Sequence, residues 1–158
     1  MPYKATMYAY SGSFALEVMG LDLPEGFQFG NKTLVPETVL TGLMDASQAT
    51  ADEHAFADSG AVTFQLTSAL LFPSFVGVRE FTCPHQDAII IPDQVMNNMF
   101  ITDGTAVQMT RVSLPRVESI VLQPHTVNFA SSEAFSGKEP KEFLEASLNR
   151  YSSIQVGD

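Results

Sequence analysis

Two segments of the sequence share one pattern, and this repeat limits the folds open to the chain more than any other feature. Each has an apolar run, a proline, an acidic residue and then apolar pairs at helical spacing; the segments are Thr33–Met44 and Ile89–Phe100. Proline lacks the N–H that a strand ladder needs, and its fixed φ suits the first position of a helix. The offset from Pro36 to Pro92 is 56 residues. The repeat predicts two strand–proline–helix units in one domain with internal pseudo-twofold symmetry.

The residues after each helix extend the repeat. In the second unit, one helix face carries Val95, Met96, Met99 and Phe100, which we expect in the core. The Asp103-Gly104 pair then predicts a turn into a strand that carries Val107, Met109 and Arg111. The matching segment of the first unit runs from Gly60 to Phe64, with Gly60 aligned to Gly104.

Alternation of apolar residues predicts further short strands. They carry Tyr8 and Tyr10; Phe14, Leu16 and Val18; Val62, Phe64 and Leu66; Val76 to Phe81; Ile120 and Leu122; and Val127 and Phe129. We expect a turn or bulge at Gly12, and a bulge or close backbone approach at Gly77. Many short strands with only brief helices indicate a mainly β fold, namely a β-barrel.

A last helix is predicted from Pro140, with Leu144, Leu148 and Tyr151 on its apolar face and Phe143 beside them. One helix and a strand stub cannot form a core of their own. We therefore expect residues 125–158 either to dock on a barrel formed by residues 1–124 or to be the front part of something longer.

Composition matters to function chiefly through charge. The net charge is −10, and no Lys or Arg lies between Lys32 and Arg79, where five acidic residues do. Such a surface repels phosphate backbones and anionic membranes, which argues against nucleic acid binding. Two interpretations of this acidic part of the sequence stay open: it forms a solubilising face, or it forms a docking surface for a basic protein partner.

The sequence also bounds where the protein works. No apolar run is long enough to cross a bilayer, and the N-terminus has no apolar stretch typical of a signal peptide, so we expect no membrane insertion. The single cysteine, Cys83, permits no intrachain disulfide and suits a reducing compartment. We expect a cytoplasmic protein, with the nucleus as a second location.

Collinear short matches resemble the N-terminal domain of the ubiquitin fusion degradation protein family. They cover residues 30–158 in order and are Val35-Pro36, Leu40, Leu43, Phe64-Gln65-Leu66, Val76–Phe81, Ile91-Pro92, Val95-Met96, Gly104, Val107-Gln108, Val112–Pro115, Leu122–His125, Asn128-Phe129, Pro140-Lys141, Leu144-Glu145, Leu148–Ser152 and Gly157-Asp158. The resemblance implies a double-psi β-barrel over residues 1–124, followed by the opening of a second, smaller α/β subdomain over residues 125–158 that this sequence truncates. Where many members have a polar hairpin connection, this chain has Leu70 to Phe75.

The resemblance also implies a role. Members are non-enzymatic adaptors that bind ubiquitin and polyubiquitin chains and deliver tagged proteins to the valosin-containing AAA+ segregase for degradation, including ER-associated degradation. They act together with the nuclear protein localisation cofactor. The segments that bind the segregase and this cofactor lie farther along the family's chain than the part matched here.

Catalytic readings are weaker. Asp58-Ser59-Gly60 resembles the active-site turn of dimeric retroviral-type aspartic proteases, and a protease that uses Asp58 is the alternative hypothesis. Cys83 and His85 lie close in sequence, but a nucleophile and its base need a third orienting group, so we expect a structural turn there. The three histidines have no metal-ligand spacing, and no phosphate-binding loop is present. We predict no catalytic residues, no metal site and no cofactor.

The candidate partner-binding residues come from two stretches. Leu70 to Phe75 is unusually apolar for a connection: exposed, it forms a binding patch; otherwise half of its side chains plug the barrel end, which is the simpler expectation. A ubiquitin contact would pair a small apolar centre with an acidic rim, because the recognition face of ubiquitin is apolar and ringed by basic groups. We therefore nominate Leu71, Phe72 and Phe75, together with the acidic Asp52 and Glu53.

Overall fold

The computed structural model describes residues 2–49, 62–70, 72–126, 128, 137 and 139–155, and the structural statements below concern these residues. The strands are β1 (Lys4–Ser11), β2 (Lys32–Leu34), β3 (Thr63–Thr67), β4 (Ser74–Glu80), β5 (Ala88–Ile91) and β6 (Thr105–Val112). The helices are α1 (Gly12–Glu17), α2 (Glu37–Ala49), α3 (Asp93–Asn98) and α4 (Pro140–Leu148), with a short 3-10 helix at Phe27–Phe29.

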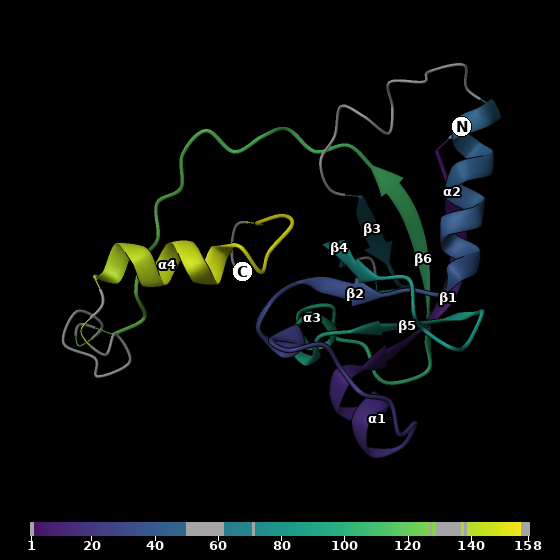
Figure 1. Cartoon of the computed structure of the whole chain (residues 1–158), viewed down its shortest axis with the longest axis horizontal. Coiled ribbons are helices and arrows are strands. Elements are labelled where there is room, and N and C mark those ends of the chain that lie inside the picture. The colour runs from purple at the N-terminus through teal and green to yellow at the C-terminus, as the bar shows by residue number, and fades with distance from the viewer. Residues whose placement is uncertain are drawn as a thin grey trace.

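The strands close into a barrel in the order β1-β5-β2-β4-β3-β6 (Figure 1). β1 runs parallel to β5 and antiparallel to β6, and β4 likewise runs parallel to β2 and antiparallel to β3. Exchanging β1–β3 with β4–β6 leaves this order unchanged. Leu34 and Ile90, which are 56 residues apart, pair with each other, so the pseudo-twofold axis passes between them. The chain is therefore a double-psi β-barrel, as predicted.

The strand register corrects one detail of the repeat. Tyr8 pairs with Ala88 and Ala106, and its counterpart Gly77 pairs with Lys32 and Thr63. Thr63 is thus equivalent to Ala106, one residue before the position that the alignment of Gly60 with Gly104 gives it; Gly60 itself lies outside the described residues. The corrected register makes the buried pair on β3, Phe64 and Leu66, equivalent to Val107 and Met109 on β6. Burial decides the register, because a one-residue slip turns every side chain to the other face.

β5 has both faces covered, as its β-branched run predicted. Ile89 and Ile91 point into the main core, where they join Phe64, Leu66 and the buried residues of α2 and α3. Ala88 and Ile90 point the other way, into a second core closed by Ala15 of α1 and by Phe27. Pro92 precedes α3 as its N-cap residue rather than as its first helical residue.

The N-terminal region departs from the alternation. Phe14 and Leu16 lie in α1 and Val18 caps it, so the predicted strand there is wrong. The Ser11 side chain accepts a hydrogen bond from Phe14 N at 3.1 Å, which is the bond that starts a helix. In β1 the buried residues are Met7 and Ala9, and Tyr8 faces outward. Because the first turn of α1 is capped locally, that bond outweighs the weak period-two signal.

The predicted strand at Ile120 and Leu122 is also wrong. Residues 113–124 are exposed and have neither helix nor strand, whereas Val127 and Phe129 lie outside the described residues. Within the described chain no strand pairs with this segment, and Pro115 and Pro124 remove two N–H donors. The segment leads to α4, which forms as predicted and lies apart from the barrel in Figure 1. The boundary predicted at residue 124 stays a prediction.

After α4 the chain returns and docks on the barrel wall. The buried Asn31 side chain donates to Ser153 O at 2.8 Å and accepts from Ser152 N at 2.9 Å. A Cβ added at Gly30 would lie 2.3 Å from Arg150 O, and one added at Gly77 would lie 1.9 Å from Ser152 Oγ. Gly77 therefore permits a close approach, as predicted, and the two glycines make room for the returning chain. None of the described helices is both long and apolar enough to cross a membrane.

Candidate functional site

Two exposed aromatic rings lie in contact, and we call them, with the exposed Leu70 two residues before Phe72 in the chain, the aromatic surface. Its members are Leu70, Phe72 and Phe100, with exposed fractions of 55%, 53% and 70%. The rings of Phe72 and Phe100 lie 5.4 Å apart between centroids, inclined at 56°. Exposed apolar groups that gather in one place mark interaction sites more often than isolated ones do.

The end of α3 fixes the position of Phe100. Ile101 N donates to Met96 O at 3.2 Å and Phe100 N donates to Asn97 O at 3.0 Å. These two bonds form a Schellman motif, which requires a left-handed residue between helix and chain exit, usually glycine. Here that residue is Phe100, with φ of 55°. A left-handed conformation costs a residue with a Cβ about 1 kcal/mol, so the exposed ring is held at some expense to the fold.

The barrel brings the two rings together from different parts of the sequence. β3 pairs with β6 so that Thr67, at the end of β3, lies opposite Gln108 near the start of β6. The β3–β4 connection that carries Phe72 therefore reaches the same barrel end as the α3–β6 connection that carries Phe100. A hydrogen bond from Leu70 N to Ser68 Oγ, at 3.3 Å, shapes the β3–β4 connection locally.

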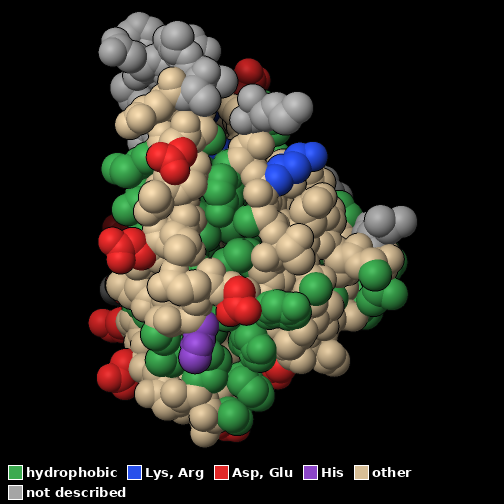
Figure 2. All heavy atoms as spheres, turned by 90° about the vertical axis from the view of Figure 1, so that its right-hand side faces the viewer, with side chains coloured by type: hydrophobic (Ala, Val, Ile, Leu, Met, Phe, Trp, Pro, Cys, Tyr) green, Lys and Arg blue, Asp and Glu red, His purple; other side chains and the backbone are tan. Residues whose placement is uncertain are grey.

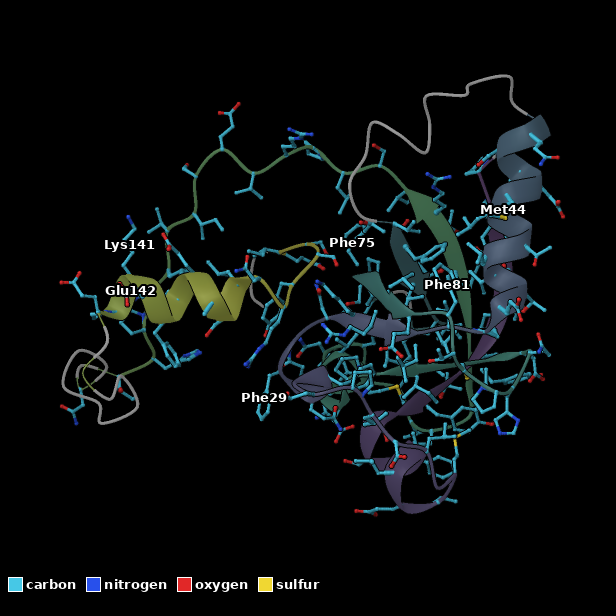
Figure 3. All side chains as sticks on the ribbon, in the orientation of Figure 1. Phe29, Met44, Phe75, Phe81, Lys141 and Glu142 are labelled. Atoms are coloured by element: carbon cyan, nitrogen blue, oxygen red, sulfur yellow. The ribbon has the colours of Figure 1, made fainter. Side chains whose placement is uncertain are left out.

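The predicted binding residues fall in different places. Phe72 and Leu70 belong to the aromatic surface, so they are not among the half of this stretch that the simpler expectation places in the barrel end. Phe75 is half-buried in β4 and lies on the barrel side that faces the C-terminal segment, where its carbonyl accepts from Ser153 Oγ at 3.0 Å (Figure 3). Leu71, Asp52 and Glu53 lie outside the described residues.

Sequence reasoning missed Phe100, which it placed in the core. Val95, Met96 and Met99 are buried as predicted, but the helix ends before Phe100 and the left-handed turn directs its ring outward. The available signal was the Asn97-Asn98 pair before it, because asparagine is a poor helix former and common near helix ends.

Acidic groups lie along α2, which covers one side of the barrel. Glu37 and Asp45 are exposed on this helix, and Met44 between them is 52% exposed. Figure 2 shows red carboxylates gathered along the side of this face, with green apolar groups beside them. The acidic half of the sequence thus places at least part of its charge on an exposed helix.

Among the described residues, Asp93 at the start of α3 is a carboxylate held by several hydrogen bonds. It accepts hydrogen bonds from Ser13 N at 3.0 Å, from Gln28 Nε2 at 2.9 Å and from Ser13 Oγ. Burial raises the pKa of Asp93, but the bonds from Ser13, Gln28 and the Gly12 backbone outweigh it, so the net pKa is lowered. A carboxylate held ionised by donors is a poor proton acceptor, and its hydrogen bonds tie α1 to α3. This cluster is structural.

Two of the residues considered for catalysis, Cys83 and His85, lie among the described residues. Cys83 is buried, and burial raises the pKa of its thiol, which opposes nucleophilic reactivity, while His85 is exposed. No group of three His, Cys, Asp or Glu in this part of the chain could hold a metal ion. Asp58, on which the aspartic protease alternative depends, lies outside the described residues, and no comparison below supports that alternative.

The chain resembles a curated protein in sequence and a solved structure in fold. No family model matches the sequence. The ubiquitin fusion degradation protein 1 homolog of Caenorhabditis elegans is 25% identical over 157 residues, covering 99% of this chain but 41% of the worm protein. The rationally designed protein apDPBB_sym_79 superposes with a TM-score of 0.46 at 8% identity, covering 70% of this chain and 100% of the designed one. The chain therefore has a distant likeness, along nearly its whole length, to about two fifths of a ubiquitin fusion degradation protein.

Proposed function

We propose that this chain is a non-enzymatic ubiquitin-binding adaptor module that acts in ubiquitin-dependent protein degradation. The observation that carries the proposal is the likeness to a ubiquitin fusion degradation protein along 99% of the chain. Because the chain spans 41% of that relative, contacts of the whole protein are part of the proposal. These are delivery of ubiquitinated proteins to the valosin-containing AAA+ segregase, and action with the nuclear protein localisation cofactor, in the cytoplasm and nucleus.

The aromatic surface is the proposed ubiquitin contact. Phe72 and Phe100 provide an apolar centre. The left-handed backbone of Phe100 lowers the stability of the fold. The chain's net charge of −10 suits the basic groups around ubiquitin's apolar recognition face. A patch of three side chains gives a weak contact, so linked ubiquitins would bind more tightly through avidity.

The test is an NMR titration of the isotope-labelled chain with mono-ubiquitin and tetra-ubiquitin. We expect shifts for residues around Phe72 and Phe100, and tighter binding of the tetramer. Phe72→Ala and Phe100→Gly should each weaken binding. Phe29→Ala is the matched control, since it removes an equally exposed phenylalanine, 67% exposed, from a different side of the barrel.

Two results would count against the proposal. Absence of any shift at high ubiquitin concentration removes the ubiquitin function. Shifts that appear but lie far from Phe72 and Phe100, and that survive both substitutions, leave ubiquitin binding standing and remove the aromatic surface as its site.

A further inference from the structure

One cleft of the molecule gathers three positively charged side chains. It has a volume of about 230 Å³ and is lined by Lys32 of β2, Arg79 of β4 and Arg150 after α4, with Glu25 at the same cleft. Gly26, Phe27 and Gly30 complete the lining. We propose that this cleft binds a short acidic segment of a partner protein, one that presents two or more neighbouring carboxylates.

Positive charge is concentrated at this cleft, although the chain as a whole is acidic. The sequence has eight Lys and Arg residues against eighteen Asp and Glu, yet three of the eight meet here. Within the described residues the ion pair joins Lys141 to Glu145 on α4, and none joins Lys32, Arg79 or Arg150 to a carboxylate. Grouped like charges repel each other, so an anionic ligand that enters the cleft removes an unfavourable term as well as gaining its own contacts.

The cleft is built by the docking of the returning chain. Arg150 belongs to the segment seated by Asn31 and Gly30, and its guanidinium lies 5.7 Å from the ring centre of Phe29. Lys32 Nζ donates to Asn149 O at 3.3 Å, which holds the ammonium at the junction. Two long side chains are thus positioned before any ligand binds, so less of their conformational freedom is lost on binding.

The shape and surroundings favour a short peptide over a nucleic acid. A nucleic acid carries charge along its whole length and would meet the acidic remainder of the chain, whereas a peptide can confine its carboxylates to the cleft. Guanidinium groups pair with carboxylates through two parallel hydrogen bonds, and Arg79 and Arg150 supply two such groups. The exposed ring of Phe29, which lies against the Arg150 guanidinium, offers an apolar contact to a residue next to the acidic ones.

The experiment uses a fluorescein-labelled peptide with paired Glu and Asp residues flanking one Phe, and measures its anisotropy with the full chain at low salt. We expect binding that weakens as salt rises, and little binding of the same peptide with Gln and Asn in place of the acids. Arg79→Gln should reduce affinity roughly three- to tenfold, the range for loss of one partly exposed charge-assisted contact. Arg116→Gln, which removes the same charge from the exposed 113–124 segment, is the matched control.

Lys32→Gln provides a second variant at the cleft, and an amide NMR spectrum of each variant checks that the barrel is intact. Equal losses in Arg79→Gln and Arg116→Gln would overturn the proposal, as would no binding by the acidic peptide. Tighter binding of inorganic phosphate or of an oligothymidylate than of the peptide would also overturn it. The assay contains no ubiquitin, so its outcome is independent of the function proposed above.

Discussion

Replacing Asp93 by asparagine tests how much its carboxylate stabilises the fold by tying α1 to α3. Asp93, at the start of α3, accepts from Ser13 N, Ser13 Oγ and Gln28 Nε2, and its own N–H donates to Gln28 Oε1 at 2.9 Å. An asparagine can still accept from the two N–H donors and donate to the serine hydroxyl. The substitution therefore removes the charge and leaves the shape.

The expected loss follows from the bonds. A hydrogen bond to a charged group contributes about 1.5–3 kcal/mol and a neutral one about 0.5–1.5 kcal/mol, so losing the charge on this half-buried group should cost roughly 1–2 kcal/mol. Asp93→Ala, which loses every side-chain bond, should cost about 2–4 kcal/mol. For a chain of this size about 1 kcal/mol lowers Tm by roughly 2–4 °C.

The pH dependence gives the sharper test. The folded pKa of Asp93 is lowered from its ordinary 3.8, so its ionised form adds stability that is present above 3.8 and lost as pH falls through the folded pKa. Urea unfolding of wild type and Asp93→Asn should therefore differ most near neutral pH, and the difference should shrink as pH falls below about 4. Asp22→Asn removes the same charge from an exposed residue and is the control.

A difference between wild type and Asp93→Asn that stays constant with pH would refute this reasoning. So would an asparagine variant as stable as wild type at neutral pH, because the donors from Ser13 and Gln28 would then gain nothing from the charge.

Three further predictions concern other parts of the fold. Phe100→Gly should be more stable than Phe100→Ala by about 1 kcal/mol in urea unfolding, because glycine removes the left-handed strain that alanine keeps; equal stabilities would contradict the strain. Gly77→Ala should speed amide hydrogen exchange in residues 150–153, since its Cβ meets Ser152 Oγ, and adding Ser152→Gly should restore protection; unchanged exchange would mean that the segment does not dock there. Cys83 should react with a thiol reagent only as fast as the protein unfolds, because burial covers the sulfur and raises the pKa of its thiol; rapid labelling under native conditions would count against this.

Some features of the fold follow from local signals in the sequence, and others follow from contacts between distant parts of the chain. The two strand–proline–helix units, the strand of Ile89 to Ile91 buried on both faces and the helix from Pro140 were all predictable. Their causes lie within a few residues: proline has no donor for a strand, and β-branched runs pack on covered sheets. The repeat also predicted the pseudo-twofold symmetry, since segments of one chain that share a sequence pattern form similar structural units.

Other features depend either on one local hydrogen bond or on partners far away in the chain. The helix at Gly12–Glu17 replaced a predicted strand because of one capping hydroxyl, and Ile120 and Leu122 formed no strand because no described strand lies beside them. Phe100 faces outward because the exit from α3 needs a left-handed residue. Its ring meets that of Phe72, which belongs to a different connection of the barrel. None of these outcomes can be read from spacing alone.

By itself the sequence determined the repeat, and with it a barrel of two interlocked halves, because alternation and proline placement act over short distances. Only the tertiary structure decided which groups meet at the surface. It set Phe72 against Phe100, and it placed Arg150 in one cleft with Lys32 and Arg79 by docking a segment from near the end of the chain. Such contacts arise from closure of the barrel and return of the chain, which bring together residues whose sequence separation carries no signal.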